Sequence, residues 1–113
     1  MSFKASARES GNVTVIDISG PLTLSEGYAL REMLRDLLDK GRKRFLLNLD
    51  EVSYLDSSGI GELVRGYTTI KKSGGELKVL HLSKRVEELL RMVNLCAVIE
   101  DYSDEQTAIR SFL

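Results

Sequence analysis

Asp56, Ser57, Ser58 and Gly59 are the residues of this chain whose types and spacing could carry chemistry. Two hydroxyls stand beside a carboxylate, after an apolar run at 45–49 and before a segment whose apolar residues recur at helical spacing. Asp and Ser side chains at such a junction accept hydrogen bonds from the free amides of a first helical turn, so a plain helix cap is one interpretation. One cap residue satisfies a helix, however, and here three candidates follow one another. A phosphate added to one of these hydroxyls would meet a helix N-terminus.

Catalysis by one of these serines is not indicated. The chain reads Leu55-Asp56-Ser57-Ser58-Gly59 and so lacks the Gly-x-Ser-x-Gly elbow of hydrolases. His81 is the only histidine, and no third group can be identified that would orient it as a general base. A lone histidine also gives no metal site. Gly59-Ile60-Gly61 follows a strand and opens a helix, but the full phosphate-loop patterns are absent. We therefore expect no enzyme activity and no cofactor.

Composition and charge exclude further classes of function. The chain has 16 basic and 17 acidic residues, 6% aromatic residues and no Trp, so we expect no nucleic-acid binding. No segment approaches the roughly 18 apolar residues that a membrane span needs, and the first residues lack a signal core. We therefore expect no membrane span and a cytoplasmic location. Cys96 is the single cysteine, and its apolar neighbours predict a buried, unreactive thiol.

The elements that must position the tetrapeptide follow from hydrophobic periodicity. Alternation at 3–7 and 13–18, around a turn at Gly11-Asn12, predicts an opening hairpin of two half-buried strands. Ser19-Gly20-Pro21 is expected to break the second strand. Helices are predicted over about 25–40 and 58–72, each followed by a glycine stop. Strands at 45–49 and 77–80 flank the second helix, and a right-handed crossover makes them parallel.

The last third of the chain shows weaker patterns. Ser83 is expected to cap a helix that ends at Asn94-Leu95, and a short strand is expected near Val98-Ile99. A final helix should begin at about Asp104. These patterns predict an α/β fold with a mixed sheet and helices against it, in one domain spanning 1–113. The apolar residues assigned to the two helices are Val86, Leu89, Leu90 and Val93 in the first, and Ala108, Ile109 and Phe112 in the second.

Around the tetrapeptide the sequence resembles the anti-sigma factor antagonists of the STAS family (sulfate transporter and anti-sigma factor antagonist). The stretch from Asn48 to Gly61 is similar to the family signature of an apolar strand followed by D-[ST]-[ST]-G-[LI]-G. Gly20, the stretch Gly74-Gly75-Glu76-Leu77 and Leu82-Ser83 also stand where the family has them. The resemblance covers essentially the whole chain. It implies the STAS fold, with a mixed sheet of four to five strands and about four helices mainly on one face.

The resemblance implies a switch by phosphorylation of Ser57, the first hydroxyl after Asp56. In the family, the kinase is a partner that is both anti-sigma factor and serine kinase, of the histidine-kinase-like ATPase type. The unmodified protein binds this partner and frees the sigma factor, whereas the phosphorylated protein lets go. A PP2C-type phosphatase then reverses the modification. Ser58 would be the neighbour of the acceptor.

The resemblance also implies a docking face next to the acceptor serine. One departure concerns this face, because many members have Gly-Glu-Leu-Asp ahead of the first helix and this chain has Gly20-Pro21-Leu22-Thr23. Thr23 in place of the usual Asp bears on which kinase is the cognate one. The residues expected to contact the partner are Gly20, Leu22, Thr23, Asp56, Ser57, Ser58, Gly59, Ile60 and Gly61.

A second hypothesis belongs to a different class of function. Some STAS domains act as scaffolds without switching, or as subunits of lipid-transport complexes, and such relatives often lack a competent serine motif. The intact Asp56-Ser57-Ser58-Gly59 argues against this alternative for the present chain.

Overall fold

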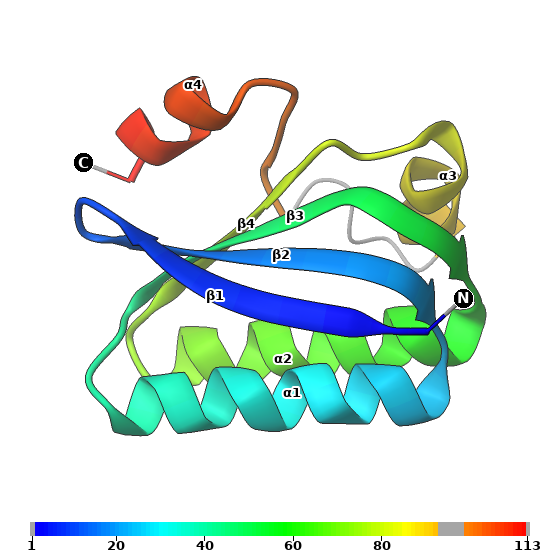
Figure 1. Ribbon diagram of the computed structural model, residues 1–113, viewed down its shortest axis with the longest axis horizontal. Helices are drawn as coiled ribbons and strands as arrows, with labels where there is room; N and C mark the ends of the chain where they lie inside the picture. Colours follow the sequence, from blue (N-terminus) through cyan, green and yellow to red (C-terminus); the bar gives the residue numbers. More distant parts are fainter. Residues whose placement is uncertain (1, 93–98, 113) are drawn as a thin grey trace.

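The computed structural model describes residues 2–92 and 99–112, in which five strands and four helices are present (Figure 1). The strands are β1 (Lys4–Ser10), β2 (Val13–Leu22), β3 (Arg44–Leu55), β4 (Glu76–Leu80) and β5 (Asp101–Tyr102). The helices are α1 (Leu24–Asp39), α2 (Ser57–Lys72), α3 (Lys84–Met92) and α4 (Glu105–Arg110). The strands form one sheet in the order β1-β2-β3-β4-β5. β1 is antiparallel to β2, and the other neighbours are parallel, so the predicted mixed α/β sheet is confirmed.

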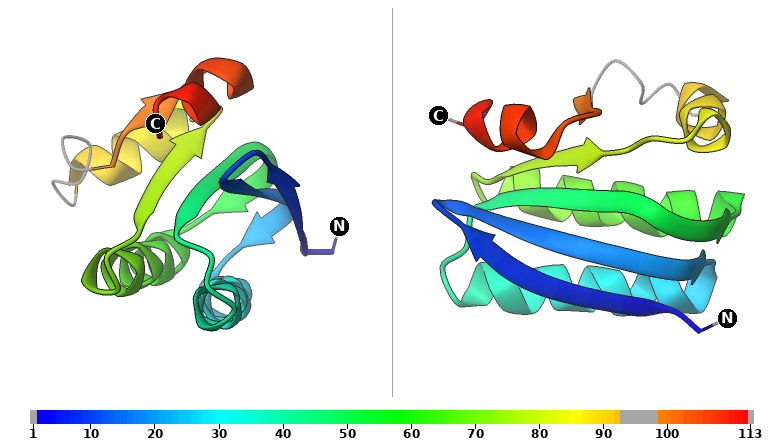
Figure 2. Two further views of the ribbon diagram at one scale, coloured as in Figure 1. Left: turned by 90° about the vertical axis from the view of Figure 1, so that its left-hand side faces the viewer. Right: turned by 45° about the horizontal axis from the view of Figure 1, so that its top comes forward.

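The helices are divided between the two faces of the sheet. α1 and α2 lie side by side along one face, and α4 lies on the other face (Figures 1 and 2). α3 shares the apolar core of α1 and α2 through Val86 and Leu90. A smaller core under α4 contains Ala108 and Phe112, packed with residues of β2 such as Val15. The expectation that the helices pack mainly on one face is therefore confirmed.

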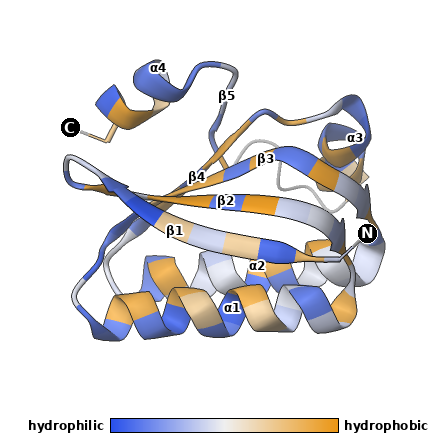
Figure 3. Cartoon of the chain, in the orientation of Figure 1, coloured by the Kyte–Doolittle hydropathy of each residue, from blue (hydrophilic) through white to orange (hydrophobic). Residues whose placement is uncertain are grey.

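The central strand β3 supplies both cores because its side chains alternate between the two faces of the sheet. Phe45, Leu47 and Leu49 belong to the large core beneath α1 and α2. Leu46 belongs to the small core beneath α4. Hydropathy along the ribbon follows this arrangement, with apolar residues concentrated in β2, β3 and β4 (Figure 3). A strand covered on both faces reads as a continuous apolar run, which is the pattern seen at 45–49.

Two strands are longer than the sequence predicted, and both corrections shape the candidate site. β2 does not break at Ser19-Gly20-Pro21 but continues to Leu22 with shifts of register, and Gly20 accommodates the irregularity with a φ of 86°. A side chain at Gly20 would also collide with the backbone of Ser2. β3 continues to Leu55, where it pairs with Leu22 of β2. The two strands therefore end side by side, and the helices that follow them start side by side.

β1 is more exposed than predicted. It is an edge strand, and most of its residues between Lys4 and Ser10 face solvent. Phe3 and Ala5 pack against the large core, and their spacing of two residues accounts for the alternation seen in the sequence. Ala7, the third residue of the alternation, is exposed, and the other positions carry charged or hydroxyl side chains that suit an exposed edge.

The last strand was predicted at the wrong residues. Ile99 is buried but lies in a bend, and β5 is formed by Asp101 and Tyr102. The pairing is made by main-chain groups, which an apolar pattern cannot predict; His81 N donates to Tyr102 O at 2.9 Å. The expectations for Val93, Asn94-Leu95, Cys96 and Val98 fall outside the described residues.

None of the helices formed by the described residues is long and apolar enough to cross a bilayer.

Candidate functional site

Asp56 alone caps α2. Its backbone is extended, and its carboxylate Oδ1 accepts a hydrogen bond from Gly59 N at 2.8 Å. Ser57 and Ser58 begin the helix and are exposed. Within the described part of the chain, neither serine hydroxyl has a hydrogen bond. The cap therefore uses only Asp56 and leaves both serine side chains exposed.

Gly59 is required by the close approach of β2 to α2. A Cβ at Gly59 would lie 2.0 Å from Leu22 O, a distance that no side chain can adopt. The backbone that approaches Gly59 belongs to the chain itself. The space that Gly59 leaves is therefore filled internally and is not available to a partner.

Four residues of the expected docking face lie below the surface. Gly20, Leu22, Gly59 and Ile60 are all buried. Leu22 and Gly59 bring the end of β2 against the start of α2, whereas Gly20 lies against the backbone of Ser2 and Phe3. The reachable members of the set are Thr23, Asp56, Ser57, Ser58 and Gly61.

The two serines differ in what lies one helical turn further along α2. The residue four positions after Ser57 is Gly61, and a Cβ there would meet nothing within 4 Å. The residue four positions after Ser58 is Glu62, a carboxylate that is only 3% exposed. Residues four apart are neighbours on a helix surface. Gly61 therefore leaves open space one turn after Ser57, whereas Ser58 is followed one turn later by Glu62, a buried carboxylate that is paired with Arg31 and Arg65.

Thr23 is the N-cap residue of α1, as Asp56 is of α2, but its hydroxyl donates a hydrogen bond where the Asp56 carboxylate accepts one. Its main-chain N–H donates to Glu26 Oε1 at 3.2 Å, and its hydroxyl donates to the same oxygen. Ser25 Oγ donates to Glu26 Oε2 at 2.8 Å. The hydrogen bond from the Thr23 hydroxyl is the main cause that lowers the pKa of Glu26, with Ser25 adding to it. Thr23 thus supplies a neutral cap at the position where many family members carry an Asp.

Thr23 and Asp56 meet in a groove between the N-termini of α1 and α2. The groove has a volume of about 670 Å³. It exists because Leu22 pairs with Leu55, which places the two helix starts next to each other. The residues that line it are Thr23, Leu24, Ser25, Tyr28, Asp56 and Glu62.

Glu62 is the functional candidate that the sequence analysis missed. It forms ion pairs with Arg31 of α1 (Nε to Oε2, 2.9 Å) and with Arg65 (NH1 to Oε1, 2.6 Å). Gly27 of α1 packs directly on it, because a Cβ at Gly27 would lie 2.6 Å from Glu62 Cβ. A signal was present in the sequence: Glu62 falls on the apolar face of the predicted helix, beside Leu63, where an acidic residue is unusual.

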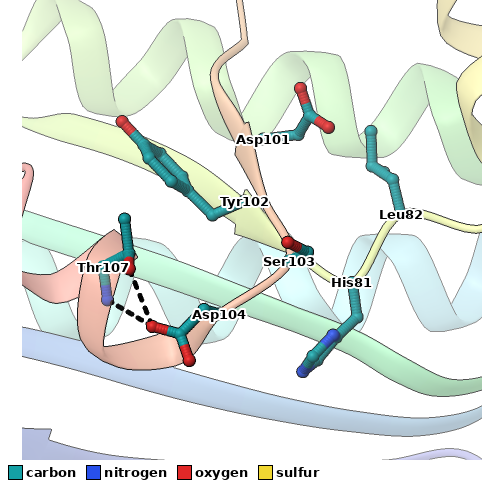
Figure 4. Close-up of a pocket in the computed structure, with 7 residues that line it drawn as sticks. All are labelled: His81, Leu82, Asp101, Tyr102, Ser103, Asp104 and Thr107. Atoms are coloured by element: carbon teal, nitrogen blue, oxygen red, sulfur yellow. Dashed lines mark hydrogen bonds between the residues drawn. The ribbon is translucent and has the colours of Figure 1, made fainter.

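A second pocket lies at the carboxyl ends of β4 and β5 (Figure 4). Its volume is about 440 Å³, and it contains no residue that the sequence predicted to be functional. His81 has a left-handed backbone with a φ of 62°, and Asp104 is engaged in capping α4, accepting from Thr107 N at 2.9 Å. Among the described residues, no group of three or more His, Cys, Asp or Glu side chains could hold a metal ion.

Comparison with known proteins finds a matching family and similar curated proteins. The sequence profile of the STAS domain family matches residues 4–108. The anti-sigma-B factor antagonist of Bacillus subtilis (strain 168) is 31% identical over 100 residues, which cover 88% of this chain and 91% of that protein. The anti-sigma F factor antagonist of Paenibacillus polymyxa is 24% identical and covers 96% of this chain and 94% of that protein.

Solved structures show the same fold. The unphosphorylated form of the anti-sigma factor antagonist SpoIIAA superposes with a TM-score of 0.77 at 20% identity, over 97% of this chain and 96% of that chain. The phosphorylated form of SpoIIAA, a cell fate determinant of Bacillus, gives a TM-score of 0.74 at 19% identity, over 97% and 99% of the two chains.

Proposed function

Because this chain belongs to the STAS domain family, we propose that it is an anti-sigma factor antagonist whose binding is switched by phosphorylation of Ser57. The proposal rests on one observation, the different roles of Asp56 and Ser57 at the start of α2. Asp56 satisfies the helix, and Ser57 is left exposed beside the open space at Gly61. The names of the curated relatives support the antagonist function.

The proposed partner is an anti-sigma factor that is also a serine kinase of the histidine-kinase-like ATPase type. The unphosphorylated protein binds this partner through the reachable residues at the two helix starts and so releases a sigma factor in the cytoplasm. The buried residues Gly20, Leu22, Gly59 and Ile60 hold that surface in position. The domain itself catalyses nothing and needs no cofactor, because the kinase supplies both the ATP site and the chemistry.

The phosphate acts by charge at the interface. It adds about −1.5 to −2 charges at neutral pH, next to the carboxylate of Asp56. A helix N-terminus tolerates this charge in the free protein, but a close-packed interface suffers from repulsion and desolvation. A hundredfold loss of affinity corresponds to about 2.7 kcal/mol, which one desolvated like-charge contact can supply. A PP2C-type phosphatase restores binding.

The proposed acceptor is Ser57, the first hydroxyl after Asp56 and the first residue of α2. Its side chain is exposed, and the residue one turn further along the helix is Gly61, which has no side chain.

The test is phosphorylation by the cognate kinase in the presence of ATP, followed by an intact mass measurement. We expect one added phosphate on the parent protein and on Ser58→Ala, and none on Ser57→Ala. Ser58→Ala is the matched control, because it removes an equally exposed hydroxyl from the same helical turn. An unmodified parent mass with a kinase that is active on another substrate would refute the proposal, as would loss of the phosphate in Ser58→Ala alone.

A further inference from the structure

Glu62 links α1 and α2 through a buried charge. Its side chain is 3% exposed, and each of its carboxylate oxygens pairs with a different guanidinium group. Oε1 lies 2.6 Å from the guanidinium of Arg65 in α2, and Oε2 lies 2.9 Å from Arg31 Nε in α1. Gly27 makes room for this link, since a Cβ there would lie 2.6 Å from Glu62 Cβ. The Glu62 carboxylate is therefore committed to these two arginines.

The pair with Arg31 extends to an aromatic ring. Arg31 Cζ lies 5.2 Å from the centroid of the Tyr28 ring, which precedes it by about one turn of α1. A guanidinium over an aromatic face is attracted by the ring. The side chain of Arg31 is 21% exposed, whereas that of Arg65 is 64% exposed. Glu62 thus holds a largely buried guanidinium that in turn lies over Tyr28.

Tyr28 itself is half exposed and lines the groove between the two helix starts. It is 51% exposed and shares the groove with the cap residues Thr23 and Asp56. Tyrosine is among the residue types that contribute most to protein interfaces, because its large ring has few rotatable bonds. The ring therefore belongs to the surface that the proposed partner contacts beside Ser57.

We propose that Glu62 is a positioning residue, which acts through Arg31 to hold the Tyr28 ring in the orientation that the anti-sigma factor contacts. The inference rests on the proposed function and concerns a buried residue that the partner does not touch. Immobilising one side chain on binding lowers affinity by a factor of roughly two to twelve. A ring that is already held by Arg31 avoids most of this loss.

The geometry of the pair shows which substitution separates positioning from support of the fold. Arg31 Nε and Glu62 Oε2 lie within ion-pair distance, but neither atom has a hydrogen bond. Charge therefore holds the contact, and the neutral amide of Glu62→Gln would release Arg31. A lysine at position 31 keeps a cation for Glu62 but has no planar group to stack on Tyr28. Arg31→Lys thus removes the hold on the ring while the ion pair between the helices can persist.

The link can be measured in the free protein by NMR. Protons above the face of an aromatic ring resonate upfield, so we expect upfield shifts for the side-chain protons of Arg31. The shifts should vanish in Tyr28→Leu, become smaller in Glu62→Gln and stay the same in Arg65→Lys. Glu62→Asp, which withdraws the carboxylate by one methylene, replaces Glu62→Gln if that variant does not fold. Unshifted Arg31 protons in the parent, or shifts that do not respond to Glu62, would overturn the inference.

Binding to the anti-sigma factor distinguishes positioning from a purely structural role. We expect Arg31→Lys to weaken binding about fivefold, within the range for ordering one side chain. Arg65→Lys is the matched control and should bind like the parent, because it alters the other partner of Glu62. In a Tyr28→Leu background, Arg31→Lys should have no further effect, since there is no ring to hold. Equal losses in the two lysine variants, or losses of Arg31→Lys and Tyr28→Leu that add, would mean that Glu62 only supports the fold.

The kinetics of phosphorylation provide a second functional readout. Arg31→Lys leaves Ser57 and its Asp56 cap intact, so we expect KM to rise as the affinity falls and kcat to stay unchanged. A lower kcat with an unchanged KM would contradict the positioning role. The two proposals also fail separately. A kinase that does not modify Ser57 refutes the proposed function while the NMR shifts still test the link, and a phosphorylated Ser57 with unshifted Arg31 protons refutes only the inference about Glu62.

Discussion

Gly59 and Gly61 lie two positions apart in α2 and have opposite surroundings. A side chain at Gly59 would meet Leu22 O at 2.0 Å, so this glycine is needed by the fold. A side chain at Gly61 would meet nothing within 4 Å, although a glycine inside a helix costs about 1 kcal/mol relative to alanine. No internal packing explains Gly61. Its place one turn after Ser57 fits the proposal that a kinase approaches this surface closely.

Alanine substitutions at these two glycines should therefore have opposite effects on stability. We expect Gly59→Ala to lower the free energy of unfolding by about 1–3 kcal/mol, because the strand or the helix must move to admit the methyl group. Gly61→Ala should raise it by about 0.5–1 kcal/mol through better helix propensity. Urea unfolding followed by circular dichroism measures both changes. The account of the two glycines would be wrong if Gly61→Ala destabilised the protein as much as Gly59→Ala.

At the scale of elements, α4 is held to the sheet by charged groups at one end. Arg8 of β1 reaches Asp17 of β2 (Nε to Oδ2, 2.7 Å) and Glu105 of α4 (NH2 to Oε1, 2.6 Å). The hydrogen bonds from Arg8 are the main cause that lowers the pKa of Asp17 and of Glu105. The pKa of Arg8 is raised, first by Glu105 and then by Asp17. This cluster connects the opening hairpin with the last helix.

The cluster should make stability depend on pH in the acid range. The folded-state pKa values of Asp17 and Glu105 lie below their ordinary values of 3.8 and 4.5. The stabilisation is therefore complete above pH 5 and is lost as the pH falls through the lowered values. We expect Arg8→Gln to cost at most about 1 kcal/mol at pH 7, since the partners are partly exposed, and to cost less by pH 3. Urea unfolding at the two pH values measures this difference.

The matched control for Arg8 is Arg35→Gln, which breaks an exposed pair with Glu32 within α1. We expect little change from this control at either pH. A cost of Arg8→Gln that is the same at pH 3 as at pH 7 would mean that the carboxylates are not responsible.

The elements with one strongly apolar face were predictable from the sequence, and the irregular ones were not. α2 and its Asp56 cap follow from helical periodicity and cap chemistry, both of which are local. The second half of β3 was missed because it pairs with β2 but not with β4, whose pairing ends at Asn48. Its side chains are therefore largely exposed, and Asp50 and Glu51 show no apolar pattern.

The candidate site was predictable only in part, for the same reason. Ser57 and Asp56 are adjacent in the sequence, and their chemistry could be recognised there. The groove depends on the pairing of Leu22 with Leu55, and the environment of Glu62 depends on packing between α1 and α2. Contacts between distant segments leave only indirect signs in a single sequence, such as an acidic residue on an apolar helix face.

At the scale of the whole molecule, the reachable residues of the site lie on one end of a layered structure. α1 and α2 run along the same face of the sheet, with their N-termini at the same end (Figure 1). Ser57 is exposed there and takes no part in the core. A charge added at this position lies at the N-terminus of α2, which favours a negative charge. The proposed switch therefore works on the surface and leaves the layers unchanged.

A charge at Ser57 should accordingly change binding without changing the fold. We expect Ser57→Asp to alter the free energy of unfolding by less than about 1 kcal/mol, because the site is exposed and at a helix N-terminus. The same variant should bind the anti-sigma factor at least tenfold more weakly. Hydrogen exchange of the parent and the variant should differ only near the start of α2. Loss of protection in β3 or α1 would instead indicate that the charge acts by unfolding.

The pairing of Leu22 with Leu55 also limits how the length of this chain can vary. The two helix starts stay aligned only while β2 and β3 each keep their number of residues, since one inserted residue turns every following side chain of a strand to the opposite face. The turn at 40–43 lies at the other ends of α1 and β3, and Gly41 there has open space around it. Inserted residues, or a fluorescent label for following partner exchange, belong in that turn, far from Ser57 and without effect on the register that builds the groove.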